Sequence, residues 1–475
     1  MMPHQQSPVR SKCAFFDRAV WRSLLAANRA GLHPLREHRL GVPARLFTLL
    51  LATLAGCAPP QSTAPSAEKP QPVTGVADRG AEQPPPSTAD GPNDPEIALP
   101  PVTESPRVVS AEDLSDGWIS LFDGETLFGW SPHSDVNWRV ERGMIVADQG
   151  TVGLLCTTTQ FSDFQLRVDF LPAAKTNSGI FLRTAPVITR DQVTTECYEL
   201  NIAPADNPFP TGSLVARQKV EGDFHRADWQ TFLVTAQGDR VEVQLNGEKI
   251  LSYHDPQPIQ RGRIGLQFNE GRIAFRKIEL KPLGLNSLLD GPDLSQWKRY
   301  PKMATRFSVS SEGYLEARNE REGRGQLETV QKFGDFVLQL EAQTHAAGLN
   351  SGVFFRCIPG EVMNGYESQI HFGYDGGDRR RPTDCGTGGI FRRQNARLVV
   401  GNDQAWVHQT LIADGPHMAV WVNGFAVSDW TDERTPDANP RRGQRLEPGT
   451  IMLQGHDATT HLSFRNLRIL EMPKR

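Results

Sequence analysis

The chain has 475 residues, with 51 basic and 55 acidic side chains and a net charge of −4. This small net charge, without a basic patch interleaved with aromatic residues, argues against a nucleic-acid partner. The length is sufficient for more than one folded domain.

The first segment, residues 1–57, has the pattern of an export signal. Basic residues precede an apolar run from Leu46 to Ala55, which is shorter than the roughly 20 residues of a membrane-spanning helix and matches the apolar region of a secretory signal. The run ends in Leu54-Ala55-Gly56-Cys57, the pattern of a bacterial lipobox, in which the cysteine thiol accepts a diacylglyceryl group. We expect an exported lipoprotein, periplasmic or at the cell surface, that contacts the membrane only through a lipid on Cys57. The alternative is an ordinary signal peptide with a chance cysteine.

The next segment, residues 58–112, is rich in Pro, Ser, Ala, Thr and Gln and shows no apolar periodicity. Such a composition cannot bury enough apolar surface to offset the entropy lost on ordering. The sequence therefore predicts a disordered linker between the lipid and a folded part.

The remainder contains one series of motifs twice, which predicts two domains at residues 113–282 and 283–475. The repeat is far longer than the roughly 20–50 residues of a solenoid unit, so each copy must have its own core. The paired motifs are LFDGETLFGW and LLDGPDLSQW, NSGIFLRT and NSGVFFRC, YELNI and YESQI, TGSLVARQ and TGGIFRRQ, a Trp before Asn-Gly in each copy, GRIGLQ and GTIMLQ, and FRKIEL and FRNLRIL.

Short strands are the main periodic feature of both copies. The segments FQLRVDF (164–170) and FVLQLEA (336–342) alternate apolar and polar residues, as half-buried strands do. Asn246-Gly247 and Asn423-Gly424 each lie between two such runs, a pattern typical of a two-residue hairpin turn. No segment of ten or more residues has the pattern of an amphipathic helix. The predicted fold is all-β, with two tandem jelly-roll sandwiches packed on each other because Gly284–Ser287 leaves little slack.

The most specific candidate site lies in YELNI and YESQI. Alternation places Glu199 and Asn201 on one face of the first strand, and Glu367, Gln369 and His371 on one face of the second. A row of carboxylate, amide and imidazole groups is how a sandwich can present polar groups to a sugar. The alternative is a solvated outer face.

Two further pairs of motifs place arginine and asparagine at matching positions. The Asn-Ser-Gly motifs begin at Asn177 and Asn350, and each is followed by a strand that ends in an arginine, Arg183 or Arg356. The Thr-Gly motifs end at Arg217 and Arg393. We interpret these six residues as candidate substrate-binding groups. The alternatives are that Asn-Ser-Gly is a turn and that each arginine pairs with a structural carboxylate.

The sequence specifies no certain cofactor and leaves the use of a metal unknown, with a divalent cation still open. The spacing of the cysteines is not that of a zinc site, and HExxH and phosphate-binding loops are absent from the sequence. An exported chain permits disulfides. Disulfides and buried thiols both remain open for Cys156, Cys197, Cys357 and Cys385.

The repeated motifs resemble the family named 3-keto-disaccharide hydrolase domain, formerly a domain of unknown function. The opening LFDGETLFGW, then DFQLRVDF, NSGIFLRT, YELNI or YESQI, TGSLVARQ, a Trp before LNGEKI, GRIGLQ and FRKIEL all stand in the family's order. The resemblance covers about 117–281 and again about 286–471. It implies a concanavalin-like jelly roll and cleavage of glycosides already oxidised at C3 of the sugar. The rival interpretation is a non-catalytic pair of carbohydrate-binding sandwiches.

The implied chemistry suits the residue types present. A ketone at C3 acidifies the C2 proton, and the glycosidic oxygen on C1 can then leave. In the second copy we expect Glu367 or His371 to transfer the proton, and Arg356 and Gln369 to hold the ketone oxygen. The first copy has Ala203 at the histidine position, so we expect Glu199 to contribute less.

Overall fold

The computed structural model describes residues 100–185, 192 and 195–474. The signal segment, the linker and Cys57 lie outside the described residues. Within the described part of the chain, no helix is long and apolar enough to span a membrane. The described chain begins with a short helix, α2 (Ala111–Ser115), whose first turn is capped because Ser110 Oγ accepts a hydrogen bond from the Asp113 amide.

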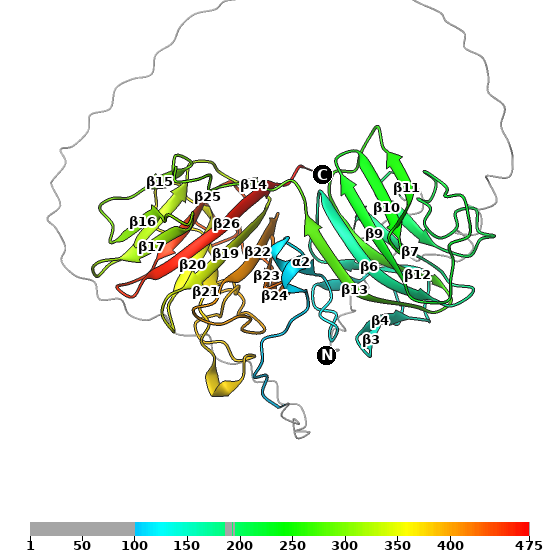
Figure 1. The fold of residues 1–475 in the computed structure, drawn as a ribbon, viewed down its shortest axis with the longest axis horizontal. Helices are drawn as coiled ribbons and strands as arrows, with labels where there is room; N and C mark the ends of the chain where they lie inside the picture. The colour runs from blue at the N-terminus through cyan, green and yellow to red at the C-terminus, as the bar shows by residue number, and fades with distance from the viewer. Residues whose placement is uncertain (1–99, 186–191, 193–194, 475) are drawn as a thin grey trace, which may run out of the picture. The chain divides into compact units, whose positions relative to one another are not determined.

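The first copy is a sandwich of two antiparallel sheets (Figure 1). Its larger sheet has the order β11-β10-β9-β6-β13-β4-β3 with β1 beside β13, and its smaller sheet has the order β2-β5-β12-β7-β8. The strands are β1 (Ile119–Ser120), β2 (Trp130–Pro132), β3 (Arg139–Glu141), β4 (Met144–Ala147), β5 (Gly153–Thr157), β6 (Phe164–Pro172), β7 (Asn177–Thr184), β8 (Tyr198–Ile202), β9 (Gln230–Gln237), β10 (Arg240–Leu245), β11 (Glu248–His254), β12 (Arg263–Glu270) and β13 (Ile273–Pro282).

The second copy repeats this arrangement strand for strand. Its larger sheet has the order β16-β17-β26-β19-β22-β23-β24 with β14 beside β26, and its smaller sheet has the order β15-β18-β25-β20-β21. The elements are β14 (Asn286–Ser287), β15 (Trp297–Arg299), β16 (Thr305–Val309), β17 (Leu315–Asn319), β18 (Gly325–Thr329), β19 (Phe336–Thr344), β20 (Ser351–Cys357), β21 (Tyr366–Ile370), the 3-10 turn η2 (Asp375–Gly377), β22 (Val407–Asp414), β23 (His417–Val422), β24 (Phe425–Thr431), β25 (Thr450–Gly455) and β26 (His461–Glu471). The prediction of two all-β sandwiches is confirmed.

Each copy has its own apolar core between its sheets, formed by the inward residues of the alternating strands. In the second copy Val353, Phe355 and Tyr366 belong to this core. The second copy also packs directly on the first: Trp421 lies in the apolar cluster of the first copy and donates a hydrogen bond from Nε1 to the Ser120 carbonyl, 2.9 Å away. Direct packing of the copies agrees with the short joint between them.

The cysteines of the described chain contribute to packing. Cys156 and Cys197 lie together in a small apolar cluster of the first copy. In the second copy, Cys357 and Cys385 are buried and form no disulfide with each other. Burial raises the pKa of the Cys385 thiol to about 12, so this thiol is protonated at neutral pH.

One buried arginine in each copy ties the two sheets together. Arg356 is fully buried at the end of β20, and its guanidinium donates to the carbonyls of Gly334 and Gly415, at 3.2 and 2.5 Å, and to Asp335 Oδ1 at 3.0 Å. Gly415 lies in the turn between β22 and β23, and Asp335 directly precedes β19, so these partners belong to the larger sheet. Arg356 therefore bridges the smaller sheet to the larger one.

Arg183 makes the matching contacts in the first copy. It is fully buried and donates to the carbonyls of Ser162 and Gly238, at 2.8 and 3.0 Å, and to Asp163 Oδ1 at 2.7 Å. Both arginines have a left-handed backbone, with φ of 51° at Arg183 and 48° at Arg356. The pairing register of both strands shifts around these positions, so each arginine departs from simple alternation.

We expect Arg356→Met to lower the free energy of unfolding by about 3 kcal/mol, because the substitution leaves buried carbonyls and a carboxylate without their partner. Urea unfolding of the full chain measures this change. The matched control is Arg306→Met, because Arg306 is exposed and pairs only with exposed Glu320; its effect should stay within about 0.5 kcal/mol. An unfolding curve for Arg356→Met that matches the wild type would contradict a structural role.

Candidate functional site

The candidate site lies on the outer face of the smaller sheet of the second copy, the face turned away from the core. Phe354 projects to this face and packs with Met363 and Met452 in a cluster separate from the core. Glu367 of β21 is paired directly with Phe354, and Gln369 with Gly352. The structure therefore brings Glu367 and Gln369 to one face, as alternation along β21 requires.

The glycine of Asn-Ser-Gly makes room for the glutamate. A side-chain Cβ at Gly352 would lie 2.5 Å from Glu367 Oε1, closer than real contacts allow. The Glu367 carboxyl group therefore lies across the backbone of β20. In the first copy, a Cβ at Gly179 would lie 3.4 Å from Glu199 Cγ. The motif that suggests only a turn in the sequence thus has a steric reason at its third residue.

Glu367 is held in an environment that favours its neutral form. Its side chain makes no hydrogen bond with any described residue, and only 9% of the residue is exposed. Burial, followed by the negative charge of Asp384, raises the pKa of Glu367 to about 8, although Arg441 and Arg392 act in the opposite direction. A carboxyl group that titrates near neutral pH can either donate or accept a proton in catalysis.

Asp384 is the second carboxylate of the site, and sequence analysis did not identify it. Asn350 Nδ2 donates a hydrogen bond to Asp384 Oδ2, and Gln369 Nε2 donates to the Asp384 carbonyl at 2.9 Å. Asp384 and Cys385 both have left-handed backbones, with φ of 44° and 73°. Such strain persists only where surrounding contacts fix the chain, and it is common near functional sites.

His371 follows the end of β21 and is fixed in orientation. Its Nδ1 lies 3.3 Å from the Leu349 carbonyl, and its Nε2 lies 3.1 Å from Thr383 Oγ1. A carbonyl can only accept, so Nδ1 donates to it, and Nε2 shares a hydrogen bond with the Thr383 hydroxyl. Neither ring nitrogen bonds to Glu367. His371 therefore holds the loop that carries Asp384, through Thr383.

A glutamine on the neighbouring strand completes the outer face in both copies. Gln454 ends the motif GTIMLQ on β25, and its buried Oε1 has no hydrogen-bond partner among the described residues. Its counterpart Gln267 lies opposite Gly179 and donates from Nε2 to Glu199 Oε1 at 3.1 Å. Sequence analysis missed this glutamine, although it occupies the same position in both repeats.

The matching face of the first copy is more closed and less polar. Glu199 is only 2% exposed, its Oε2 has no hydrogen-bond partner among the described residues, and burial raises its pKa to about 8. Asn201 uses its side-chain amide to bond the Phe209 carbonyl, and Asn177 is half-buried at the start of β7. Hence Glu199 shares the burial of Glu367, but no carboxylate comparable to Asp384 lies beside it in the described residues.

The structure contradicts three of the arginine predictions. Arg183 and Arg356 are the buried ties described above, so neither reaches the outer face, because the register shift turns each side chain towards the larger sheet. Arg217 is also structural: it pairs with Asp255 at 3.0 Å and stacks on Tyr198, with its guanidinium carbon 4.5 Å from the ring centre.

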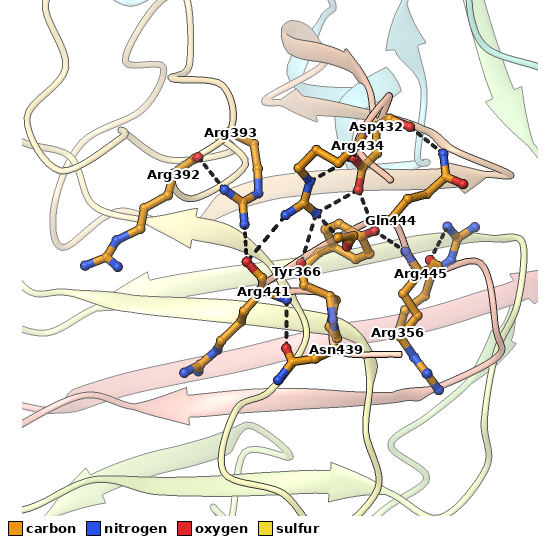
Figure 2. Close-up of polar contacts among 12 residues, drawn as sticks. Arg356, Tyr366, Arg392, Arg393, Asp432, Arg434, Asn439, Arg441, Gln444 and Arg445 are labelled. Carbon is orange, nitrogen blue, oxygen red and sulfur yellow. Dashed lines mark hydrogen bonds and ion pairs between the residues drawn. The ribbon is translucent and has the colours of Figure 1, made fainter. Parts of the chain in front are cut away.

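Arg393, the fourth predicted arginine, links two loops. Its Nη1 donates to the Arg392 carbonyl at 3.0 Å and its Nη2 to the Arg441 carbonyl at 2.9 Å (Figure 2). The position that Arg217 occupies against Asp255 is taken in the second copy by Arg434, which pairs with Asp432 at 2.8 Å. Arg393 instead uses its guanidinium group to connect the two loops beside Glu367.

Two loops that are longer in the second copy supply Thr383, Asp384 and Arg441, which sequence analysis did not identify. The segment between Ile370 and Gly388 carries Thr383 and Asp384, and it is longer than the matching segment, residues 203–211. The segment 433–448 carries Arg441 and is longer than residues 256–261 of the first copy. The unequal gaps between aligned motifs were the available indication of these insertions.

Comparison with known proteins agrees with this architecture of duplicated sandwiches bearing polar groups on one sheet face. The chain matches the family of the 3-keto-alpha-glucoside-1,2-lyase-like domain twice, over residues 117–281 and 284–470. The chain belongs to this family, which indicates a carbohydrate hydrolase-like or lyase-like function, or carbohydrate binding.

The individual relatives cover parts of the chain. The 3-keto-disaccharide hydrolase of Bacteroides thetaiotaomicron is 30% identical over 90 residues, which are 16% of this chain and 31% of that protein. Among solved structures, a glycosyl-hydrolase candidate from Parabacteroides distasonis is 21% identical, with a TM-score of 0.33, and the match covers 37% of this chain and 98% of that one. The carbohydrate-binding module CBM66 of Bacillus subtilis is 15% identical, with a TM-score of 0.26, over 32% of this chain and 95% of the module.

Across the described residues, no group of three or more His, Cys, Asp and Glu side chains is arranged to hold a metal ion. The question of a divalent cation raised by the sequence stays open.

The burial of Glu367 predicts a pH-dependent gain in stability for Glu367→Gln. An ordinary glutamic acid has a pKa of 4.5, whereas that of Glu367 is about 8 in the folded chain. Between these values the unfolded chain has released the proton that the folded chain still holds, so the stability of the wild type falls as pH rises through this window. Glu367→Gln removes that loss. We expect a free energy of unfolding higher than that of the wild type by about 2–4 kcal/mol above pH 8, and no difference below pH 4.5.

Urea unfolding at pH 4, 6 and 8.5 measures the difference, with exposed Glu312→Gln as the control that should match the wild type throughout. A Glu367→Gln chain that is less stable than the wild type at pH 8.5 would show instead that the carboxylate is a structural partner.

Proposed function

We propose that the second copy cleaves the glycosidic bond of 3-keto glycosides, with Glu367 as the general acid and Asp384 as the general base. The observation that carries the proposal is the carboxylate pair itself. Glu367 is buried, without a hydrogen-bond partner among the described residues, and sensitive to the charge of Asp384, which is exposed. Two carboxyl groups in contrasting environments are a recognised basis for dividing acid and base roles. The family match supports this class of reaction and a carbohydrate ligand.

The reaction has two stages. The carboxylate of Asp384 removes the C2 proton of the sugar, and the electron pair of the C–H bond forms an enolate with the C3 ketone. The enolate then forms the C1=C2 double bond as the C1–O bond breaks, and Glu367 gives its proton to the departing oxygen. Water adds across this double bond: its hydroxyl bonds to C1, the Glu367 carboxylate accepts the proton that the water loses, and the Asp384 carboxyl group returns its proton to C2.

In place of the buried Arg356, one side chain on the outer face is suited to hold the ketone oxygen as charge develops. Gln454 lies on the strand next to Gly352, and its amide is not hydrogen-bonded to any described residue, so its Nε2 can donate to an enolate. Gln369 and Asn350 fix Asp384 through its carbonyl and carboxylate. His371 acts as a positioning residue through Thr383.

The first copy fits a binding or structural role better than a catalytic one. The glutamate of the first copy, Glu199, is already hydrogen-bonded to Gln267. On the neighbouring strand, the polar Gln326 and Glu328 of the second copy correspond by register to Leu154 and Cys156 of the first. This contrast favours a single catalytic copy.

We expect Glu367→Gln and Asp384→Asn each to lower kcat by roughly 10²–10⁴, the usual cost of losing a general acid or base. Release of methanol from methyl 3-keto-glucoside measures the rate, because an alcohol leaves only with the proton that Glu367 supplies. The matched control is Glu199→Gln, whose kcat should stay within a few fold of the wild type. Because the acid must be protonated, kcat of the wild type should fall as pH rises through about 8. Equal, small losses from all three variants would favour the binding-module alternative.

We also propose that the chain is exported and anchored through a lipid on Cys57, supported by the apolar run and the lipobox-like Leu54-Ala55-Gly56-Cys57. In a bacterial host, the wild type should be recovered in the membrane fraction, and Cys57→Ser should move to the soluble fraction. A Cys57→Ser protein that stays with membranes after a carbonate wash would contradict lipid anchoring.

A further inference from the structure

The outer face around Glu367 has a cationic side that the proposed reaction does not use. Arg392 and Arg441 are both exposed, and neither has a carboxylate within ion-pair distance among the described residues. In contrast, Arg434 pairs with Asp432 at 2.8 Å, and Arg442 lies 3.7 Å from Asp437. The two uncompensated guanidinium groups lie on the same side in Figure 2, away from Asp432.

Backbone contacts place both arginines beside Glu367. Arg392 follows Phe391, whose amide donates to the Glu367 carbonyl at 3.0 Å. Arg441 donates from Nη2 to the Met363 carbonyl at 2.6 Å, and Met363 packs on Phe354, the residue paired with Glu367. The arginines therefore approach the same glutamate from two loops.

The chain fixes these arginines at some conformational cost. Arg392 has a left-handed backbone with φ of 59°, a conformation that non-glycine residues seldom adopt. Arg393 bonds the carbonyls of both Arg392 and Arg441 and so sets the distance between their loops. The first copy has Ala216 where Arg392 stands, with a φ of 58°, and has no segment comparable to the one that carries Arg441. At this position the same backbone conformation carries a cation in the second copy and alanine in the first.

We propose that Arg392 and Arg441 bind an anionic oxygen group, a carboxylate or a sulfate, carried by the glycoside that binds on the outer face beside Glu367. Guanidinium groups bind such oxyanions through short, charge-assisted hydrogen bonds. Gln369 donates to the Asp384 carbonyl, so Asp384 lies on the Gln369 side of Glu367, and the face around Glu367 has an acidic and a cationic side. A substrate with a neutral reacting sugar and an acidic substituent matches this division. The inference rests on the proposed function in taking the ligand to be a 3-keto glycoside.

Binding of uncleavable probes tests the inference separately from catalysis. The probes are two matched pairs of carbon-linked 3-keto glycosides. One pair has a 4-carboxyphenyl or a 4-carboxamidophenyl group, and the other has a carboxylate or a carboxamide at C6 of the sugar. Calorimetric titration of the full chain should show that one of the acids binds about tenfold more tightly than the matched amide, and the acid that does so locates the anion. The preference should weaken with added salt, because exposed charges are screened.

Variants assign the preference to the two arginines. Arg392→Gln and Arg441→Gln should each reduce the acid preference, and the double variant should abolish it. Arg442→Gln, a neighbour already facing Asp437, should retain it. Equal binding of the acids and the amides by the wild type, failure of every probe to bind, or a preference that survives in the double variant would overturn the inference.

The two proposals can fail separately. Cleavage of neutral 3-keto glycosides without any acid preference in binding would leave the proposed reaction standing and overturn the anion site. Acid-selective binding that depends on both arginines, without cleavage of any 3-keto glycoside, would support the anion site and overturn the reaction.

Discussion

Each sandwich depends on one buried guanidinium group that bonds both of its sheets. Arg183 and Arg356 satisfy backbone carbonyls of the larger sheet from a strand of the smaller one, and each pairs with an aspartate that precedes a central strand. A buried charge is tolerated only when hydrogen bonds replace its lost hydration. The geometry of these bonds fixes the end of β7 or β20, including its left-handed residue. Because the arginine turns towards the larger sheet, the outer face of the smaller sheet in the second copy is formed by Phe354, Gly352 and the residues paired with them, Glu367 and Gln369.

On that outer face, the two copies have the same backbone arrangement but differ in the contacts and loops around the glutamate. Both place a glutamate over a glycine and beside a glutamine, and both raise the pKa of the glutamate to about 8 through burial. In the first copy the glutamine closes on Glu199. In the second copy the carboxyl group of Glu367 remains unbonded to described residues, and longer loops carry Asp384 and Arg441. The two copies thus share a scaffold and differ in the loops beside the glutamate.

The fold was predictable because its signals are local. Alternating strands and Asn-Gly turns are periodic patterns, and the repeat showed which of them belong together. The shared face of Glu367 and Gln369 was predictable for the same reason, since an even separation on a strand fixes it.

The rest of the site was not accessible to such rules. Arg356 was misassigned because a register shift with a φ of 48° breaks alternation at that residue. Asp384 and Arg441 come from inserted loops, whose path depends on tertiary contacts. Gln454 lies on β25, and the sequences of β25 and β20 do not by themselves determine the register in which these strands pair.

The most direct test of this account is exchange at C2 of a 3-keto glycoside in D₂O, followed by proton NMR against a sample without protein. If Asp384 removes the C2 proton and Glu367 protonates the leaving oxygen, Glu367→Gln should still exchange C2 hydrogen for deuterium in uncleaved substrate, because the enolate forms but collapses back. Asp384→Asn should show neither exchange nor cleavage. Exchange that persists in Asp384→Asn but disappears in Glu367→Gln would contradict the assignment and make Glu367 the base.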